Sequence, residues 1–104
     1  MSQRILVLSE VRLLRDALVE ALGRHPTMRV VAAASQAEAL ARCDEDAPNV
    51  VLIDSAMSKC EEVIRMLLND RPELIVIAIG TDQLRLLRCA EAGAAGFVPR
   101  EGSI

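Results

Sequence analysis

The chain has 104 residues, 52% of them hydrophobic, and a formal net charge of −3. This length predicts a single domain over residues 1–104, large enough to bury a core without disulfides or metals. Its single lysine, Lys59, and its dispersed arginines argue against direct nucleic acid binding by this segment, because phosphate backbones are bound by clustered basic side chains. The apolar runs are too short to span a bilayer and no signal peptide is recognisable, so we expect a cytoplasmic protein without membrane association.

The aromatic and cysteine residues are few. Phe97 is the only aromatic residue, so the core must consist of aliphatic side chains. The three cysteines, Cys43, Cys60 and Cys89, are odd in number and widely spaced. This spacing fits neither a disulfide framework nor a zinc site, and we expect buried, reduced thiols.

The first half of the chain alternates short apolar runs with helical patterns. Residues 4–8 read RILVL, which is typical of a strand that is covered on both faces. A helix is expected next, ending near Gly23, with an apolar stripe of Val11, Leu14, Leu18 and Leu22. A weaker strand over 30–33 precedes a capping box formed by Ser35 and Glu38, which predicts a helix to about Cys43.

The same alternation continues in the second half. An apolar strand over 50–53 ends at Asp54, and a second capping box over 58–61 predicts the start of a helix. The most hydrophobic strand is expected over 74–79, followed by a helix that ends at Gly93 and a short strand over 95–99. This strict alternation predicts an α/β fold with a doubly wound, parallel, five-stranded sheet.

The chain ends about five residues after the last predicted strand, where a doubly wound sheet usually continues into a covering helix. With that final helix missing, we expect apolar surface to be exposed on the first, third and fifth strands and on the first helix. Exposed apolar patches of this kind tend to be occupied. The sequence therefore predicts a homodimer, and exchanged or shared elements are one arrangement for it.

Polar residues follow the strands where parallel strands share one edge. Ser9 and Glu10 follow the first strand, Asp54 ends the third, and Arg100 follows the fifth. The fourth presents Ala78, or Gly80 and Thr81 if the register slips. Ligands bind at this edge of open parallel sheets, and two carboxylates facing a basic group could hold a phosphoryl group and a divalent cation such as Mg²⁺.

Three stretches, ILVLSEVRLLRDALVEAL, VVLIDSAM and AEAGAAGFVPRE, resemble the receiver domain of response regulators of the NarL/LuxR type. The resemblance covers essentially the whole chain and implies a flavodoxin-like sheet with strand order 2-1-3-4-5. It implies that Asp54 accepts a phosphoryl group from a sensor histidine kinase. It also implies Mg²⁺ binding by Glu10, Asp54 and the backbone carbonyl of Ala56, phosphate-facing positions at Arg100 and Ala78, and a switch residue at Phe97.

Several positions depart from the family pattern. Ser9 replaces one of two acids, which lowers the negative charge available to Mg²⁺. Ala78 replaces a threonine or serine that would bond a phosphoryl oxygen, and Arg100 replaces a lysine with a planar donor. Simpler interpretations also exist: Ser9 or Thr81 as a helix cap, Glu10 as a first-turn acid, Arg100 as a solvated side chain, and Phe97 as a core residue.

Three functions remain open at this point. The first is a two-component receiver that regulates a partner or an output domain, which for this type implies transcription regulation. The second is a pseudo-receiver, a dimerisation or protein-interaction module that does not depend on phosphorylation. The third, an enzyme on a flavodoxin-like sheet, is disfavoured because the chain has no Gly-rich phosphate loop and no nucleophile–histidine pair. We therefore expect no catalytic residues and a non-enzymatic protein.

Overall fold

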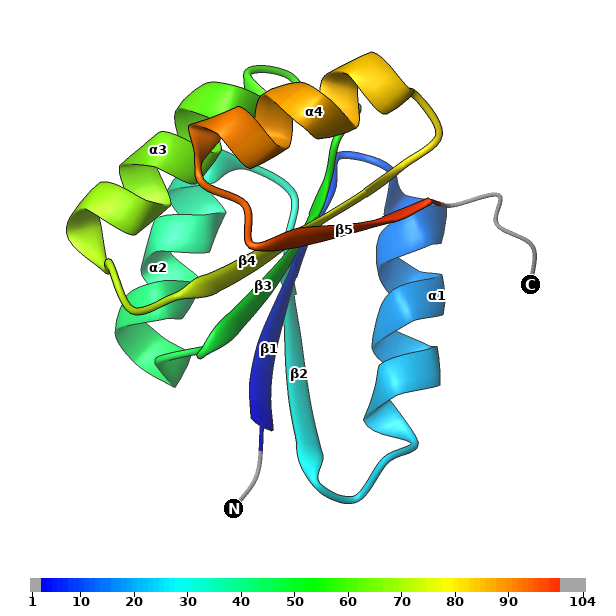
Figure 1. Ribbon diagram of the computed structural model, residues 1–104. Coiled ribbons are helices and arrows are strands. Elements are labelled where there is room, and N and C mark those ends of the chain that lie inside the picture. The colour runs from blue at the N-terminus through cyan, green and yellow to red at the C-terminus, as the bar shows by residue number, and fades with distance from the viewer. Residues whose placement is uncertain (1–2, 100–104) are drawn as a thin grey trace.

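The computed structural model describes residues 3–99 as a parallel five-stranded sheet with four helices (Figure 1). The strand order is β2-β1-β3-β4-β5, so the predicted fold class and strand order are confirmed. No helix follows β5 within residues 3–99. The elements, in chain order, are β1 (Gln3–Leu8), α1 (Arg12–Gly23), β2 (Met28–Ala33), α2 (Gln36–Asp46), β3 (Val50–Asp54), α3 (Cys60–Asp70), β4 (Ile75–Gly80), α4 (Gln83–Ala92) and β5 (Gly96–Pro99).

The main core lies between the sheet and helices α2, α3 and α4, which share one face of it (Figure 1). Alternate strand residues point into this core because successive side chains of a strand face opposite sides. The fully buried strand residues of this core are Leu6, Leu8, Val51, Ile53, Val76 and Ala78. Helix α3 contributes the predicted apolar side, with Val63, Ile64 and Leu67 buried.

Helix α1 lies on the other face, against β1 and β2, and none of its residues is buried (Figure 1). The predicted apolar stripe is therefore only half-buried, and Val11 is 47% exposed. The helix covers one side of this face, and no second helix flanks it within residues 3–99. Among the described residues no helix is long and apolar enough to cross a bilayer.

The exposed apolar surface agrees with the expectation on β5 and α1 but not on β1. Residues Ile5 to Leu8 of β1 are all buried, because β1 is a central strand that α1 covers on one face. Exposure occurs as predicted at Val98 of β5, 49% exposed, and at Leu13 of α1, 80% exposed, and it also occurs at Ile75 of β4, where it was not expected. An edge strand such as β5 has a neighbour on one side only, so its side chains lose less surface to packing.

The helix N-caps in the structure can be compared with those that the sequence predicts. Ser35 accepts a hydrogen bond from the Glu38 amide at 3.2 Å, so the predicted cap at Ser35 is confirmed, while the Glu38 carboxylate accepts from the amide of Ala34, the residue before the cap, at 2.6 Å. Helix α4 is capped by Asp82, whose carboxylate accepts from two backbone amides, and not by Thr81. The predicted cap at Thr81 is wrong because the next residue, an acid, takes that role.

The second predicted capping box is also wrong. Helix α3 begins at Cys60, and the residue before it, Lys59, has φ 56° in the left-handed region and makes no side-chain cap. Ser58 instead donates to Glu10, in the loop that follows β1. A tertiary contact therefore outcompetes the local cap that the sequence pattern indicates.

Candidate functional site

Asp54 ends the central strand β3 and is 5% exposed. Its Oδ2 accepts a hydrogen bond from the Ser9 hydroxyl at 2.8 Å, and its Oδ1 accepts one from the Ala56 amide at 3.0 Å. Both carboxylate oxygens therefore have a donor, as a buried carboxylate requires. The structure confirms the predicted position of Asp54 at the carboxyl end of the third strand.

Ser9 connects the loop after β1 to this carboxylate. Its hydroxyl donates to Asp54 and accepts from the Val11 amide at 3.0 Å, while its carbonyl accepts from Arg15 at 2.9 Å. Helix α1 begins only at Arg12, so the prediction of Ser9 as its N-cap is wrong. The Ser9 hydroxyl donates to the Asp54 carboxylate because a hydrogen bond to a charged acceptor is stronger than one to a neutral acceptor.

Glu10, the second predicted acid, is exposed and turns toward the loop after β3. Its Oε1 accepts from the Ser58 amide at 3.1 Å and from the Ser58 hydroxyl at 3.3 Å. Glu10 and Asp54 thus both contact the segment of residues 55–59, hereafter the β3–α3 loop, at the same edge of the sheet.

The residues available for a cation are hard oxygen donors. Two carboxylates, Glu10 and Asp54, and the main-chain carbonyl of Ala56 are ligand types that Mg²⁺ prefers. No group of three or more His, Cys, Asp or Glu residues suited to a metal occurs within residues 3–99. Because Ser9 stands beside Asp54 where a further acid would complete such a group, the donors fit Mg²⁺ in type but with a reduced negative charge.

The fourth strand extends further than the main prediction. Strand β4 ends at Gly80, and Ala78 lies two positions earlier, fully buried in the core between Ile53 and Phe97 in the sheet register. Gly80 and Thr81, the residues expected at the edge if the register slips, therefore stand at the carboxyl end of β4, and the phosphate-facing role of Ala78 stays a prediction. The apolar run alone could not fix this end, because glycine at its last position is indistinguishable from the following turn.

Gly80 and Ser55 occupy one small space. A Cβ atom built on Gly80 would collide with the Ser55 hydroxyl oxygen and would lie 3.1 Å from the Ser55 Cβ. Ser55 is 2% exposed, and its amide donates to the carbonyl of Ile79 in β4 at 2.8 Å. The β4 edge thus has a hydroxyl beside it, supplied by the residue after Asp54. Sequence reasoning missed Ser55, although a serine directly after the acid was the available signal.

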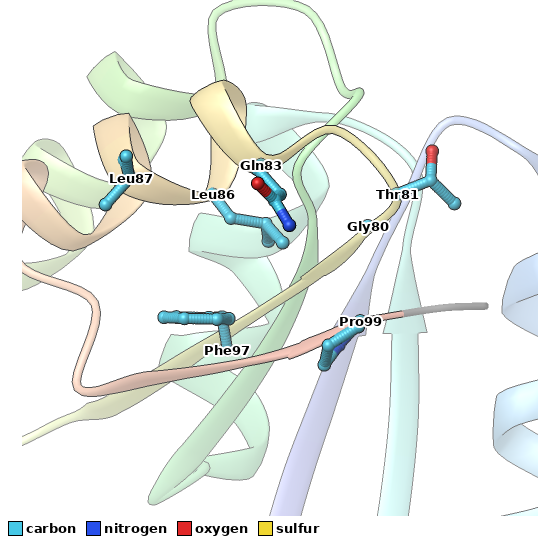
Figure 2. Close-up of a pocket in the computed structure, with 7 residues that line it drawn as sticks. All are labelled: Gly80, Thr81, Gln83, Leu86, Leu87, Phe97 and Pro99. Atoms are coloured by element: carbon cyan, nitrogen blue, oxygen red, sulfur yellow. The ribbon is translucent and has the colours of Figure 1, made fainter. Parts of the chain in front are cut away.

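Phe97 lies on β5 and is 50% exposed, so its interpretation as a core residue is wrong. Figure 2 shows its side chain facing Leu86 of α4 across a cleft of about 330 Å³ that also includes Gly80 and Pro99. The short edge strand gives the ring only partial cover. The predicted switch role of Phe97 stays a prediction, and Arg100 lies outside the described residues.

The family model for the response regulator receiver domain matches residues 5–103. The chain is similar to a LuxR-family two-component response regulator from Aurantimonas sp. (24% identity, TM-score 0.86), covering 99% of this chain and 77% of that one. A LuxR-family DNA-binding response regulator from Silicibacter pomeroyi matches at 25% identity and TM-score 0.80, with 97% and 81% covered.

The fold is also shared with the chemotaxis protein CheY4 of Vibrio cholerae, at 16% identity and TM-score 0.86, covering 99% of this chain and 90% of that one. No curated protein sequence matches the chain.

The contact between Gly80 and Ser55 predicts the effect of a single methyl group. Gly80→Ala should lower the free energy of unfolding by about 1–3 kcal/mol, because overpacking forces the loop or the strand to move. Adding Ser55→Ala should recover part of this loss, since the closest atom is then gone. Urea denaturation measures both, with Gly23→Ala as a control because a Cβ there meets nothing within 4 Å. Equal losses in the single and double variants would contradict the contact.

Proposed function

Because this chain belongs to the response regulator receiver domain family, we propose that it accepts a phosphoryl group from a sensor histidine kinase on Asp54. The observation that carries the proposal is a buried carboxylate at the carboxyl end of the central strand, between Ser9 and the β3–α3 loop. Ligand sites of open parallel sheets lie at this edge. The protein then acts in two-component signal transduction and is not a metabolic enzyme.

In this reaction a carboxylate oxygen of Asp54 attacks the phosphorus of a phosphohistidine. The new O–P bond forms as the P–N bond breaks, and the imidazole nitrogen leaves with its electron pair and takes up a proton. The Ser9 hydroxyl bonds Asp54 Oδ2 and the Ala56 amide bonds Oδ1, and each of these hydrogen bonds lowers the nucleophilicity of its oxygen. The Ser9 hydroxyl can rotate toward a phosphoryl oxygen, while a backbone amide has no such freedom.

A bound Mg²⁺ would neutralise charge on the phosphoryl oxygens during transfer. Glu10, Asp54 and the carbonyl of Ala56 are the residues that would hold it. Glu10 Oε1 accepts from the Ser58 amide and hydroxyl at 3.1 and 3.3 Å, so these hydrogen bonds compete with a cation for that oxygen. We therefore expect weak Mg²⁺ binding and slow phosphorylation.

A pseudo-receiver is the second candidate, and the Ser9–Asp54 hydrogen bond favours it. The bond satisfies Asp54 without a cation, so the site is stable as it stands. Neither Ala78 nor Gly80 of β4 carries a hydroxyl that could bond a phosphoryl group and transmit a signal from it. In this alternative the fold serves as a dimerisation or protein-interaction module.

The output of the receiver is proposed from the family type. Regulation of transcription through a partner or an output domain is the activity that the NarL/LuxR resemblance implies. Leu84 and Leu87 of α4 are each 57% exposed, and Leu87 lines the same cleft as Phe97. Exposed apolar side chains gathered on one side of a domain are suited to contact with another protein.

Incubation with acetyl phosphate and Mg²⁺ tests the phosphoacceptor directly. The intact mass should increase by one phosphoryl group, and the Asp54→Asn variant should show no increase, because an amide is not the nucleophile that a carboxylate is. The circular dichroism spectrum of each sample serves as the folding control. A folded parent protein that gains no mass would support the pseudo-receiver instead.

The role of Ser9 is tested by restoring an acid. Ser9→Asp places a second carboxylate beside Asp54, so it should strengthen Mg²⁺ binding and lower stability in the absence of the cation. The increase in melting temperature on adding Mg²⁺ should therefore be larger for Ser9→Asp than for the parent. Ser9→Asn, with nearly the same shape and no charge, is the control. An equal response of the Asp and Asn variants would show that Ser9 does not limit cation binding.

A homodimer is proposed from the exposed apolar residues Ile75 and Val98, which lie on strands β4 and β5. Sedimentation velocity over a concentration series should show a dimer, and Val98→Asp should shift it to the monomer because a buried charge is costly. Leu13→Asp, at the most exposed apolar residue of α1, compares the two surfaces. A parent protein that stays monomeric at high concentration contradicts the proposal.

A further inference from the structure

Two cysteines that are far apart in the sequence face each other in the structure. Cys60 is the first residue of α3 and Cys89 lies in α4, and their sulfur atoms are 3.5 Å apart. Their exposed fractions are 6% and 1%. Cys43, on α2, is equally buried, and all three thiols are free. The chain therefore contains one close thiol pair and a third buried cysteine for comparison.

We propose that Cys60 and Cys89 form a reversible disulfide in the presence of a hydroperoxide, and that this bond fastens α4 to the end of the β3–α3 loop. A disulfide has a sulfur–sulfur distance of about 2.05 Å, so the two atoms need to approach by roughly 1.5 Å. The helices α3 and α4 already pack against each other, which keeps the two side chains on facing surfaces.

A small oxidant can reach this pair. Both cysteines line a polar cleft of about 380 Å³ between the β3–α3 loop and α4. Lys59, Arg85 and Arg88 line this cleft together with Glu61 and Asp82, so its lining carries charges of both signs. The pair is thus buried against the core but accessible from one side.

The reaction balances with the hydroperoxide as a two-electron oxidant. One thiolate attacks the outer peroxide oxygen, the O–O bond breaks, and an alcohol leaves with one proton, which gives a sulfenic acid. The second thiol attacks the sulfenic sulfur, the S–O bond breaks, and water leaves with the remaining proton. Two thiols have then been oxidised to one disulfide, and the hydroperoxide has been reduced to an alcohol and water.

The surroundings of the two thiols affect their pKa values. Burial raises the pKa of both thiols, and the pKa of Cys60 is raised further by Cys89, Asp54 and Glu61. For Cys89, the hydrogen bond from Cys60 and the nearby Arg85 oppose the effect of burial and Glu61 on its pKa. Since both pKa values are raised, oxidation should quicken as the pH rises above neutral.

The disulfide would have a mechanical consequence at the site. It closes a chain loop between positions 29 apart in the sequence, which restricts the unfolded chain and stabilises the folded one. It also limits the displacement of α4 relative to the loop that carries Ser55 and Ser58. Formation of the disulfide requires no phosphorylation, so its test is independent of the function proposed for Asp54.

The test uses the full chain treated with hydrogen peroxide, followed by intact mass and non-reducing peptide mapping. The expected result is loss of about 2 Da, a Cys60–Cys89 peptide pair, full reversal by a dithiol, and a melting temperature raised by roughly 5 °C or more. Cys43→Ser is the matched control and should behave as the parent does. Cys60→Ser and Cys89→Ser should lose both the link and the increase in melting temperature.

Two measurements keep the outcome clear if a serine variant is unstable. Cys60→Ala and Cys89→Ala repeat the test without a buried hydroxyl, and circular dichroism shows whether each variant is folded. A link that includes Cys43, disulfides only between two chains, or oxygen addition without loss of hydrogen would overturn the proposal. So would a parent protein whose thiols remain reduced under conditions that oxidise a free dithiol peptide.

Discussion

The hydrogen bond from Ser9 to Asp54 is the interaction on which the rest of the site depends. Asp54 lies where the centre of the sheet ends, and a carboxylate buried there is stable only if donors reach both of its oxygens. Ser9 and the Ala56 amide are those donors, and each belongs to a different loop. The two loops that border the site are consequently fixed by one side chain.

This arrangement sets stability against reactivity. The donors that stabilise the buried carboxylate also occupy the oxygens that must attack a phosphorus atom. An acid at position 9 would repel Asp54 and invite a cation to relieve the repulsion, whereas serine relieves it without one. Serine at position 9 therefore makes the cation-free domain more stable than an acid would, and it reduces the need for Mg²⁺ at the site. The receiver and pseudo-receiver interpretations differ only in whether the Ser9 hydrogen bond yields to a phosphoryl donor.

The sequence predicted the features that depend on periodicity. Doubly apolar runs and intervening helical stripes gave the sheet, its helices and the position of Asp54, because burial on both faces leaves few alternatives. It failed where a polar side chain had a choice of partners. Ser58 bonds Glu10 instead of capping α3, and Ser9 bonds Asp54 instead of capping α1. Such choices are decided by residues more than forty positions away, which a local pattern cannot contain.

The β3–α3 loop shows what those distant contacts build. Ser55 packs over Gly80 at the end of β4, Ser58 holds Glu10, and the residue after the loop, Cys60, faces Cys89. One short segment next to Asp54 therefore contacts β4, the loop after β1 and α4. In the family pattern a hydroxyl on the fourth strand connects the phosphoryl group to the surface, and here Ala78 stands at that position, two residues before the strand ends in Gly80. We expect a change at Asp54 to reach α4 through this loop, because Ser55 fills the space that the missing side chain leaves.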